Sequence, residues 1–545
     1  MDWRRATEVA SAIAARWTTE RGPGGAILLF DADNIRAETC GGLASLELDV
    51  AFTAETATRY ASISKHFLAA LVLRLCDTGF LSLDDVLGAH LPGLLPALAA
   101  VPLGRALDMT SGLPDLMETQ WLLGVPWTAG LDRHALLRFA CRLDALNYPS
   151  GSEISYTNTG YRLIEAALAL KSQPVNAALH QHFFEPLALL IRLAEDETEP
   201  MPGLATGYWR NETGWRRGRY GLNFSASGGL AGSARDLVAW LQALLGDRPP
   251  AEGLFARLGA RRLLTDGRRT GYGLGLARTL LGDEIAIGHG GSLPGYKNDF
   301  ILLPEHGAGV VVLSNREDTN AADVARAVLA GLIGAALPSP ATDLLPNGLF
   351  VTDEGPYWIE HDAGKLTFLG AMTDLFAAEE GWAVSASAHY PIRLRSDANG
   401  INSAIEGEIG HVARRFHKVA PDAALTAAWE GIWHCAAHDA HFIITRDGDA
   451  WRMISGTGPL HASRKLLPLD ANRALTSRAD GPWRQRACLW LEPDGDTIRL
   501  VSHRSRMLRF SRATTPRPLF AGEVGERSKT GEGRAARPSP AALRA

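Results

Sequence analysis

The stretch Ser62-Ile63-Ser64-Lys65 decides the fold, because it stands at the start of an apolar segment whose spacing predicts a core helix over residues 63–80. On a helix, residues three apart share a face, so the Lys65 amine is expected beside the Ser62 hydroxyl. An unprotonated lysine held there can act as a general base for a serine nucleophile. The chain has seven lysines, and only Lys65 has a serine three residues before it.

A second motif, Tyr156-Thr157-Asn158, lies in a turn-rich segment just before a predicted helix at residues 161–170. A tyrosine hydroxyl can move a proton, and an asparagine amide can hold a substrate carbonyl. The alternative is an ordinary loop in which Asn158 caps the helix. Tyr296-Lys297-Asn298 repeats the pattern, so this motif by itself is not specific.

A third motif, His289-Gly290-Gly291, follows a predicted strand and is the only His-x-Gly among 16 histidines. Glycines beside a strand edge let a substrate backbone approach closely, which makes Gly291 a candidate substrate-binding residue. His289 offers a hydrogen-bond donor or a positive charge near a developing anion. The alternative is a hairpin histidine.

The first 337 residues or so mix helical and strand patterns. Strands are expected near both ends of this part, and helices between them. This order predicts an α+β or α/β domain whose two ends share one sheet. The expected strands are residues 24–30, 299–303 and 309–314, and the expected helices include residues 233–245, which open on a capping-box pattern, and a closing helix at 324–337.

Beyond Pro338-Ser339-Pro340, short alternating segments separated by glycine turns replace the helical pattern. The stretch Gly348-Leu349-Phe350 is echoed by Gly431-Ile432-Trp433, and each precedes a similar strand and turn. Two tandem antiparallel β-barrel domains are therefore expected. The predicted division is a catalytic domain at 1–337, barrels at 338–420 and 421–520, and a disordered tail at 521–545 that is rich in Gly, Ser, Pro and Arg.

The composition excludes several classes of function. A net charge of −5 gives no bulk attraction for nucleic acid or for an anionic membrane, and no apolar run is long enough to span a bilayer. The five cysteines are scattered, which favours a reducing, cytoplasmic location. Two clusters are interpreted as surface features, the histidines 434, 438 and 441 rather than a zinc site, and the arginines 504, 506, 509 and 512 as a solvated strand face.

In this order and at these separations, the three motifs resemble those of the penicillin-recognising serine hydrolases, which include penicillin-binding proteins and class C β-lactamases. The family's Ser-x-x-Lys is matched by Ser62 and Lys65, its Tyr-x-Asn by Tyr156 and Asn158, and its third motif by His289 and Gly291. Leu107-Asp108-Met109-Thr110-Ser111-Gly112-Leu113-Pro114-Asp115 is similar to a further segment common in the family. The resemblance implies a β-lactamase-like catalytic domain over about residues 5–335.

A catalytic domain followed by two barrels resembles the D-aminopeptidase branch of that family. This implies release of small N-terminal D-residues, such as D-alanine, from peptides or amides. The resemblance also implies that a loop of the last barrel supplies an acid for the substrate ammonium, and Asp480 in residues 477–483 is the candidate. A surface hairpin is the alternative. A homodimer is expected by analogy.

The resemblance implies an acyl-enzyme on Ser62, with Lys65 or Tyr156 as the base, Tyr156 as the acid, and backbone N–H groups of Ser62 and the strand after His289 as the oxyanion hole. No metal or organic cofactor is implied. An esterase, a D,D-carboxypeptidase or a β-lactamase on the same domain is the first alternative, and an arginine in the pocket would favour a substrate carboxylate. A non-catalytic sensor or scaffold is the second.

Overall fold

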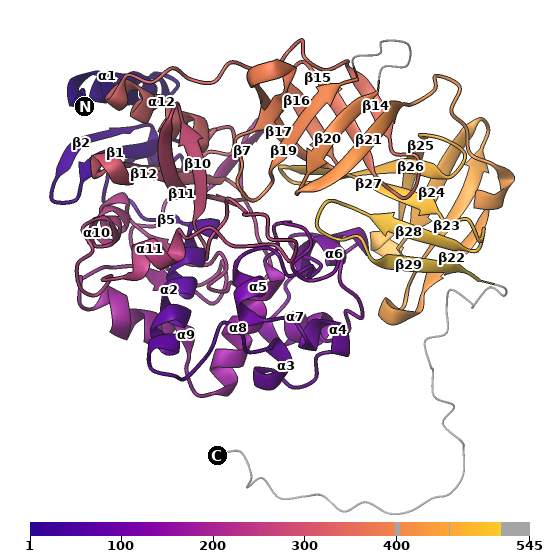
Figure 1. The fold of residues 1–545 in the computed structure, drawn as a ribbon, viewed down its shortest axis with the longest axis horizontal. Coiled ribbons are helices and arrows are strands. Elements are labelled where there is room, and N and C mark those ends of the chain that lie inside the picture. The colour runs from indigo at the N-terminus through magenta and orange to yellow at the C-terminus, as the bar shows by residue number, and fades with distance from the viewer. Residues whose placement is uncertain (398–403, 457, 514–545) are drawn as a thin grey trace, which may run out of the picture.

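The structure is a computed structural model, and it describes residues 1–397, 404–456 and 458–513 (Figure 1). The predicted tail at 521–545 lies outside the described residues. Among the helices of the described part, none combines the length and the apolar character that crossing a membrane requires.

A six-stranded antiparallel sheet organises the first part of the chain (Figure 1). Strand β1 pairs with β13 along its whole length, from Gly25 opposite Ser314 to Asp31 opposite Ala308. The two ends of this part therefore meet in one sheet, as the sequence predicts. The strand order is β10 (Ala277–Leu281), β11 (Glu284–Leu293), β12 (Tyr296–Leu303), β13 (Ala308–Ser314), β1 (Gly25–Asp31) and β2 (Ile35–Gly41).

Helices cover both faces of this sheet, so its central strands are apolar on both sides. Ile27 and Leu29 of β1 pack with the helices α1 (Trp3–Thr19) and α12 (Ala321–Ile333), whereas Leu28 belongs to the larger cluster on the other face. Helix α12 ends earlier than the sequence predicts. Gly334 takes a left-handed φ of 71° at its C-cap, which stops the helix.

The larger cluster is built around α2 (Ser64–Asp77), whose residues are all buried from Ser64 to Leu73. An apolar helix of this kind is expected at the centre of a large domain rather than at its surface. Helix α10 (Ala234–Leu245) packs against β1 and β13. It opens with the predicted capping box, in which Ser233 and Asp236 each bind the other's backbone N–H.

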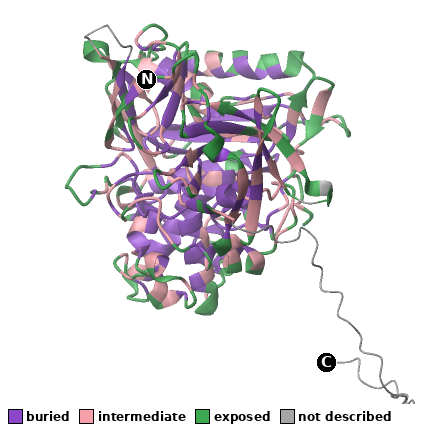
Figure 2. Cartoon of the chain, turned by 90° about the vertical axis from the view of Figure 1, so that its right-hand side faces the viewer, coloured by how far each residue is buried: buried purple, intermediate pink, exposed green. Residues whose placement is uncertain are grey.

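Between β2 and β10, short helices and strands surround α2. Figure 2 shows buried residues gathered in the sheet and in the helices next to it, with exposed residues on the outside. The helices are α3 (Leu87–His90), α4 (Pro96–Ala99), α5 (Leu103–Leu107), α6 (Leu116–Leu122), α7 (Arg133–Ala140), α8 (Thr159–Leu170), α9 (Val175–Leu179) and α11 (Leu254–Leu258). The strands are β3 (Leu43–Ser45), β4 (Val50–Ala51), β5 (Thr58–Arg59), β6 (Arg192–Leu193), β7 (Tyr208–Asn211), β8 (Gly214–Arg217) and β9 (Leu230–Gly232).

Two closed antiparallel barrels follow, which confirms the fold class expected from the sequence. The first contains β14 (Gly348–Val351), β15 (Trp358–Asp362), β16 (Lys365–Phe368), β17 (Ala371–Ala377), β18 (Ala383–Ser385), β19 (Ile392–Ser396), β20 (Ile405–Ile409) and β21 (Val412–Lys418). The second contains β22 (Gly431–Cys435), β23 (Ala440–Asp447), β24 (Ala450–Ser455), β25 (Ala462–Pro468), β26 (Arg473–Asp480), β27 (Trp483–Leu491), β28 (Thr497–Val501) and β29 (Leu508–Arg512).

The second barrel lies against α6 of the catalytic domain (Figure 1). The connection between β28 and β29 reaches the start of α6, where the N–H of Asp115 donates to the carbonyl oxygen of Arg504 at 2.8 Å. The side chain of Arg478, on β26, donates to the carbonyl oxygen of Trp121 at 2.6 Å. These contacts attach a loop and a strand of the second barrel to the two ends of α6.

Candidate active site

Ser62 lies in a single 3-10 turn, η1 (Ala61–Ile63), immediately before α2. Ala61 has a φ of 54°, a left-handed conformation that costs energy for a residue with a side chain. Strand β11 passes next to this turn, and a Cβ atom at Gly291 would lie 2.0 Å from the carbonyl oxygen of Tyr60. Glycine at position 291 therefore lets the strand edge lie against the turn that carries Ser62.

The Lys65 side chain is fully buried and points at Ser62. Its Nζ lies 3.2 Å from Ser62 Oγ, 2.8 Å from Asn158 Oδ1 and 2.6 Å from the carbonyl oxygen of Ser227. Burial holds the pKa of Lys65 well below its ordinary value, because a charged ammonium loses its hydration there. A neutral amine has two hydrogens and one lone pair. The two carbonyl oxygens take the hydrogens, and the lone pair is left for the Ser62 hydroxyl.

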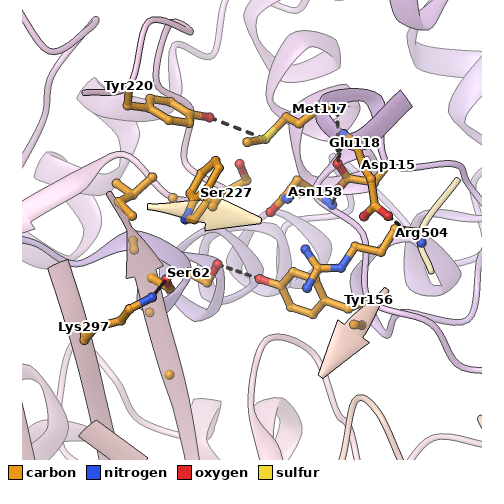
Figure 3. A pocket seen from close by; sticks show the side chains of 18 of the residues that line it. Ser62, Asp115, Met117, Glu118, Tyr156, Asn158, Tyr220, Ser227, Lys297 and Arg504 are labelled. Atoms are coloured by element: carbon orange, nitrogen blue, oxygen red, sulfur yellow. Dashed lines mark hydrogen bonds between the residues drawn. The ribbon is translucent and has the colours of Figure 1, made fainter. Parts of the chain in front are cut away.

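Tyr156 lies on the other side of Ser62, and its hydroxyl donates to Ser62 Oγ at 2.6 Å (Figure 3). Burial raises the pKa of Tyr156 above its ordinary value, so the phenol keeps its proton. Lys65 Nζ lies 4.9 Å from the centre of the Tyr156 ring, and the guanidinium of Arg504 lies 4.7 Å from it. In this state Tyr156 is a proton donor, and Lys65 is the available base.

The amide of Asn158 is held at both ends. Its Oδ1 accepts from Lys65, and its Nδ2 donates to Asp115 Oδ2 at 2.9 Å. Asp115 Oδ2 also accepts the backbone N–H of Asn158 at 2.7 Å, while its Oδ1 caps the first turn of α6. Asp115 therefore fixes the orientation of Asn158, which in turn orients Lys65.

His289, on β11, lines the same cavity but does not touch Ser62. Its Nε2 lies 2.9 Å from the hydroxyl of Tyr272, and its Nδ1 lies 2.6 Å from the carbonyl oxygen of Gly290. The carbonyl requires a proton on Nδ1, so Nε2 accepts from Tyr272. Burial holds the pKa of His289 well below its ordinary value, and the ring is neutral. The sequence predicted that His289 offers either a hydrogen-bond donor or a positive charge, and the neutral ring carries no positive charge.

All three parts of the chain line one cavity of about 640 Å³. The catalytic domain contributes Ser62, Tyr156, Asn158, His289 and Gly291. The first barrel contributes Gly370, Ala371 and His389, and the second contributes Pro482, Trp483, Arg484, Gln485, His503 and Arg504. The motifs that are distant in sequence thus meet in one place, and the barrels enclose them.

Asp480 occupies a different position from the one expected. It ends β26 at the tip of the hairpin that reaches the cavity, but its Oδ2 accepts the backbone N–H of Trp127 at 2.6 Å. The next residues of the hairpin line the cavity, and Trp483 packs edge-on against Trp127. Asp480 is not among the described residues that line the cavity. Its carboxylate holds the hairpin to the catalytic domain.

Asp115, Glu118 and Asp299 are acids that line the cavity, and sequence reasoning missed Glu118 as a site residue. Glu118 lies on α6, and its Oε1 accepts from Gln485 Nε2 at 2.6 Å and from the backbone N–H of Arg504 at 3.2 Å. Burial raises the pKa of Glu118, and the charge of Arg504 opposes this shift. The sequence signal was Asp115 followed three residues later by Glu118, which indicates a helix start and not a ligand site.

Two of the arginines interpreted as a solvated strand face do not lie on a strand face, and that interpretation is wrong for them. Arg504 lines the cavity, and the side chain of Arg506 is only 4% exposed. They lie in the connection after β28, where the strand alternation on which the interpretation rested does not apply. Within the described ranges, no three or more His, Cys, Asp or Glu residues are grouped so that they could hold a metal ion.

A family model described as Beta-lactamase matches residues 9–335, which is more than half of the chain, and the chain belongs to this family. A D-aminopeptidase from Gluconobacter oxydans (strain 621H) is 28% identical over 365 residues, which cover 66% of this chain and 67% of that protein. A D-aminopeptidase from Brucella melitensis biotype 1 is 26% identical over 494 residues, covering 85% of this chain and 90% of that one.

Solved structures show the same fold. The octameric penicillin-binding protein homologue from Pyrococcus abyssi superposes with a TM-score of 0.54 at 18% identity, over 94% of this chain and 100% of that one. The D-amino acid amidase from Ochrobactrum anthropi SV3 in complex with L-phenylalanine amide gives a TM-score of 0.51 at 22% identity, over 61% of this chain and 99% of that one. These likenesses establish the architecture around the cavity.

Proposed function

We propose that the chain is a serine hydrolase that releases an N-terminal D-amino acid, small like D-alanine, from peptides or amides through an acyl-enzyme on Ser62. The observation that carries this proposal is the contact of Ser62 Oγ with Lys65 Nζ at 3.2 Å and with the Tyr156 hydroxyl at 2.6 Å, in a cavity that also holds a carboxylate. The D-aminopeptidases among its relatives support the substrate class.

The reaction begins with proton transfer from Ser62 to Lys65. The neutral amine accepts this proton as Ser62 Oγ attacks the scissile carbonyl carbon. Asn158 and the carbonyl oxygen of Ser227 hold the amine in place before and after it is charged. Tyr156 keeps its own proton at this stage, so Lys65 is our assignment for the general base.

The tetrahedral intermediate carries its negative charge on the former carbonyl oxygen. Backbone N–H groups of Ser62 and of β11 after His289 form the oxyanion hole in this proposal. The approach of β11 at Gly291 brings that strand beside the Ser62 turn. Loss of one such donor typically costs about 2.7–4 kcal/mol of transition-state stabilisation.

Collapse of the intermediate needs a proton on the leaving nitrogen. The phenol of Tyr156 supplies it, and the proton that Ser62 gave to Lys65 restores the phenol. Water then attacks the acyl-enzyme through the same groups in reverse, which frees the D-amino acid and Ser62.

An aminopeptidase must also hold a charged substrate ammonium, because a buried ammonium without a counter-charge is costly. Glu118 takes this role in our proposal, in place of Asp480. Its carboxylate lines the cavity near Asn158, whereas the carboxylate of Asp480 is engaged with the backbone of Trp127. Asp115 is less suitable, since both of its oxygens already accept hydrogen bonds.

Arg504 favours a second candidate function. Its guanidinium lies over Tyr156 in the same cavity and could bind a substrate carboxylate, as a D,D-carboxypeptidase or a β-lactamase requires. We place it second because the relatives matched over the catalytic domain and the barrels are D-aminopeptidases. An esterase on the same domain needs neither charge.

Hydrolysis of D-alanine p-nitroanilide, its L-enantiomer and N-acetyl-D-alanine p-nitroanilide tests the proposal. We expect turnover of the free-amine D-form alone. Faster turnover of the acetylated form, or of a simple ester, would favour an esterase. Turnover of acyl-D-alanyl-D-alanine or of a β-lactam in preference would favour the second candidate. No turnover of any of them would point to the sensor or scaffold alternative.

The homodimer and the cytoplasmic location stay predictions. The relative from Pyrococcus abyssi is octameric, so the assembly of this chain has to be measured. Sedimentation velocity of the full chain gives its mass in solution, and fractionation of cells that express it gives its compartment.

A further inference from the structure

Asp299, on β12, is a buried carboxylate that the proposed mechanism does not use. It is 8% exposed, and within the described part of the chain no hydrogen bond or ion pair reaches its side chain. Burial raises the pKa of Asp299 to about 7, which the positive charge of Arg326 only partly opposes. A buried carboxylate without a partner is costly unless a ligand supplies one.

Asp299 lines the catalytic cavity and also a second cavity of about 300 Å³ beside it. The second cavity lies between the sheet and the first barrel. Its walls come from β10, β11 and β12, from the start of α12, and from residues 372–376 and 386–389 of the barrel. His289, Gly290 and His389 line both cavities, so the second adjoins the first at the third motif.

The second cavity is lined by more acidic side chains than charged basic ones. Asp299 and Asp374 line it, and among the described residues no cation forms an ion pair with Asp374 either. Arg326 lines it too, but its guanidinium is paired with Asp323 and lies over the ring of Phe376. Its histidines add no positive charge, since burial lowers the pKa of both His289 and His389. An ammonium group is therefore the complementary ligand.

Gly290, the middle residue of the third motif, leaves the Asp299 carboxylate uncovered. A Cβ atom at Gly290 would lie 2.8 Å from Asp299 Oδ2, so any side chain there would press on that oxygen. On the barrel side, Ser387 Oγ and His389 Nδ1 are buried without a hydrogen-bond partner in the described residues. Both residues line the second cavity together with Asp299, whose carboxylate oxygens can accept hydrogen bonds from an ammonium group.

Two histidines that line the second cavity lie close to Tyr156, the proton donor to the leaving nitrogen in our proposal. Tyr156, which protonates the leaving nitrogen, has its ring centre 5.0 Å from that of His389 and 6.3 Å from that of His289. The two imidazoles are stacked with their centres 6.1 Å apart. Glu118, our partner for the substrate ammonium, is on α6 and does not line the second cavity.

We propose that Asp299 is the charged binding group of a leaving-group subsite for a positively charged amine. D-aminoacyl amides whose released part carries an ammonium group are then preferred substrates. This inference rests on the proposed function. It adds a specificity-determining carboxylate from β12, in a cavity completed by the first barrel.

The test compares two D-alanyl amides of equal length, one made with 1,5-diaminopentane and one with hexylamine. Only the first carries a charge on its leaving group. The ratio of their kcat/KM values is measured for the wild type, for Asp299→Asn and for the control Asp422→Asn, which removes one exposed carboxylate in the connection between the barrels. The ratio within one protein does not depend on how much of it is folded.

We expect the wild type to prefer the charged amide, and Asp299→Asn to lower this preference by about ten- to a hundredfold, the usual range for one hydrogen-bonded charge. Asp422→Asn should keep the wild-type ratio. A wild-type ratio near one, or a ratio that Asp299→Asn leaves unchanged, would overturn the subsite. Turnover of neither amide by the wild type would overturn the proposed function, and the subsite with it. If Asp299→Asn does not fold, the ratio of the two kcat/KM values is measured for Asp299→Ser and compared with that of the wild type.

Discussion

The carboxylate of Glu153 and the guanidinium of Arg506 form an ion pair of 2.8 Å whose side chains are 6% and 4% exposed. Glu153 precedes Tyr156 by three residues, and Arg506 belongs to the second barrel. Arg414 of the first barrel lies 3.8 Å from the other carboxylate oxygen. One buried carboxylate thus joins the loop of the second motif to both barrels.

Replacing Glu153 by glutamine should destabilise the chain. Arg506 would stay buried without its counter-charge, which typically costs about 3–5 kcal/mol. Urea unfolding of Glu153→Gln measures this loss. The matched control is Glu406→Gln, which breaks an exposed pair with Arg395 and should cost no more than about 1 kcal/mol. An equal decrease in the free energy of unfolding for the two variants would mean that the buried ion pair does not stabilise the junction of the three domains.

Replacing Ser62 by alanine should abolish hydrolysis and leave the fold intact. Removal of the nucleophile in a comparable serine hydrolase lowers kcat by about a millionfold. The side chain is small, and among the described residues its hydroxyl forms hydrogen bonds only with Lys65 and Tyr156, so thermal unfolding should change little. A folded Ser62→Ala protein that retained activity would contradict the acyl-enzyme on Ser62.

The acidic limb of the pH profile of kcat/KM should follow the protonation of Lys65. The base works unprotonated, so kcat/KM falls as the pH drops below the pKa of Lys65, which burial holds well below 10.5. The charge of Asp115 raises this pKa, and that of Arg504 lowers it. Asp115→Asn should therefore move the limb to lower pH, and Arg504→Gln should move it to higher pH.

Opposite displacements in these two variants distinguish Lys65 from a purely structural lysine. The readout is the midpoint of the limb and not the activity, because Asp115→Asn also weakens the hold on Asn158. A limb that stays in place in both variants would mean that another group is the base.

Glu118→Gln should selectively lower kcat/KM for substrates that carry a free amino terminus. The variant keeps the size of the side chain but removes the charge that we assign to the substrate ammonium. We expect kcat/KM for D-alanine p-nitroanilide to fall about ten- to a hundredfold, with a smaller loss for an uncharged ester. Asp480→Asn is the comparison. It should affect both substrates alike, because Asp480 binds the backbone of Trp127. The reverse pattern would return the role to Asp480.

Gly291→Ala should inactivate the protein through sterics alone. The new Cβ atom would lie 2.0 Å from the carbonyl oxygen of Tyr60, and β11 or the Ser62 turn would have to move. Gly130→Ala is a suitable control, since nothing lies within 4 Å of a Cβ atom there. We expect loss of activity in the first variant and none in the second, measured on the same substrate. An active Gly291→Ala protein would show that this close approach is not required.

Much of the fold could be predicted from local patterns. Three predicted features depend only on neighbouring residues, and the structure contains all of them. They are the core helix after Ser62, the capping box at Ser233 and the strands at the two ends of the first part. The similarity between the segments that begin at Gly348 and Gly431 predicted two barrels for the same reason, because the alternation of residues in a strand and the glycine turns are local features.

The identities of the partners in the site could not be predicted in this way. Glu118 stands where a helix begins and was not singled out, Arg504 was interpreted as part of a solvated strand face, and Asp299 had no local signal. The second barrel brings Arg504 to Glu118, and the first barrel closes the cavity that Asp299 lines, and both barrels are distant in sequence from these acids.

The sequence by itself thus determined the pairing of Ser62 with Lys65, because helical spacing places these two residues together without a distant contact. It also determined the order of the domains. Only the tertiary structure decided which charges face the substrate. Burial sets whether an amine or a carboxylate is charged, and burial depends on how the barrels close over the catalytic domain, which no local pattern records.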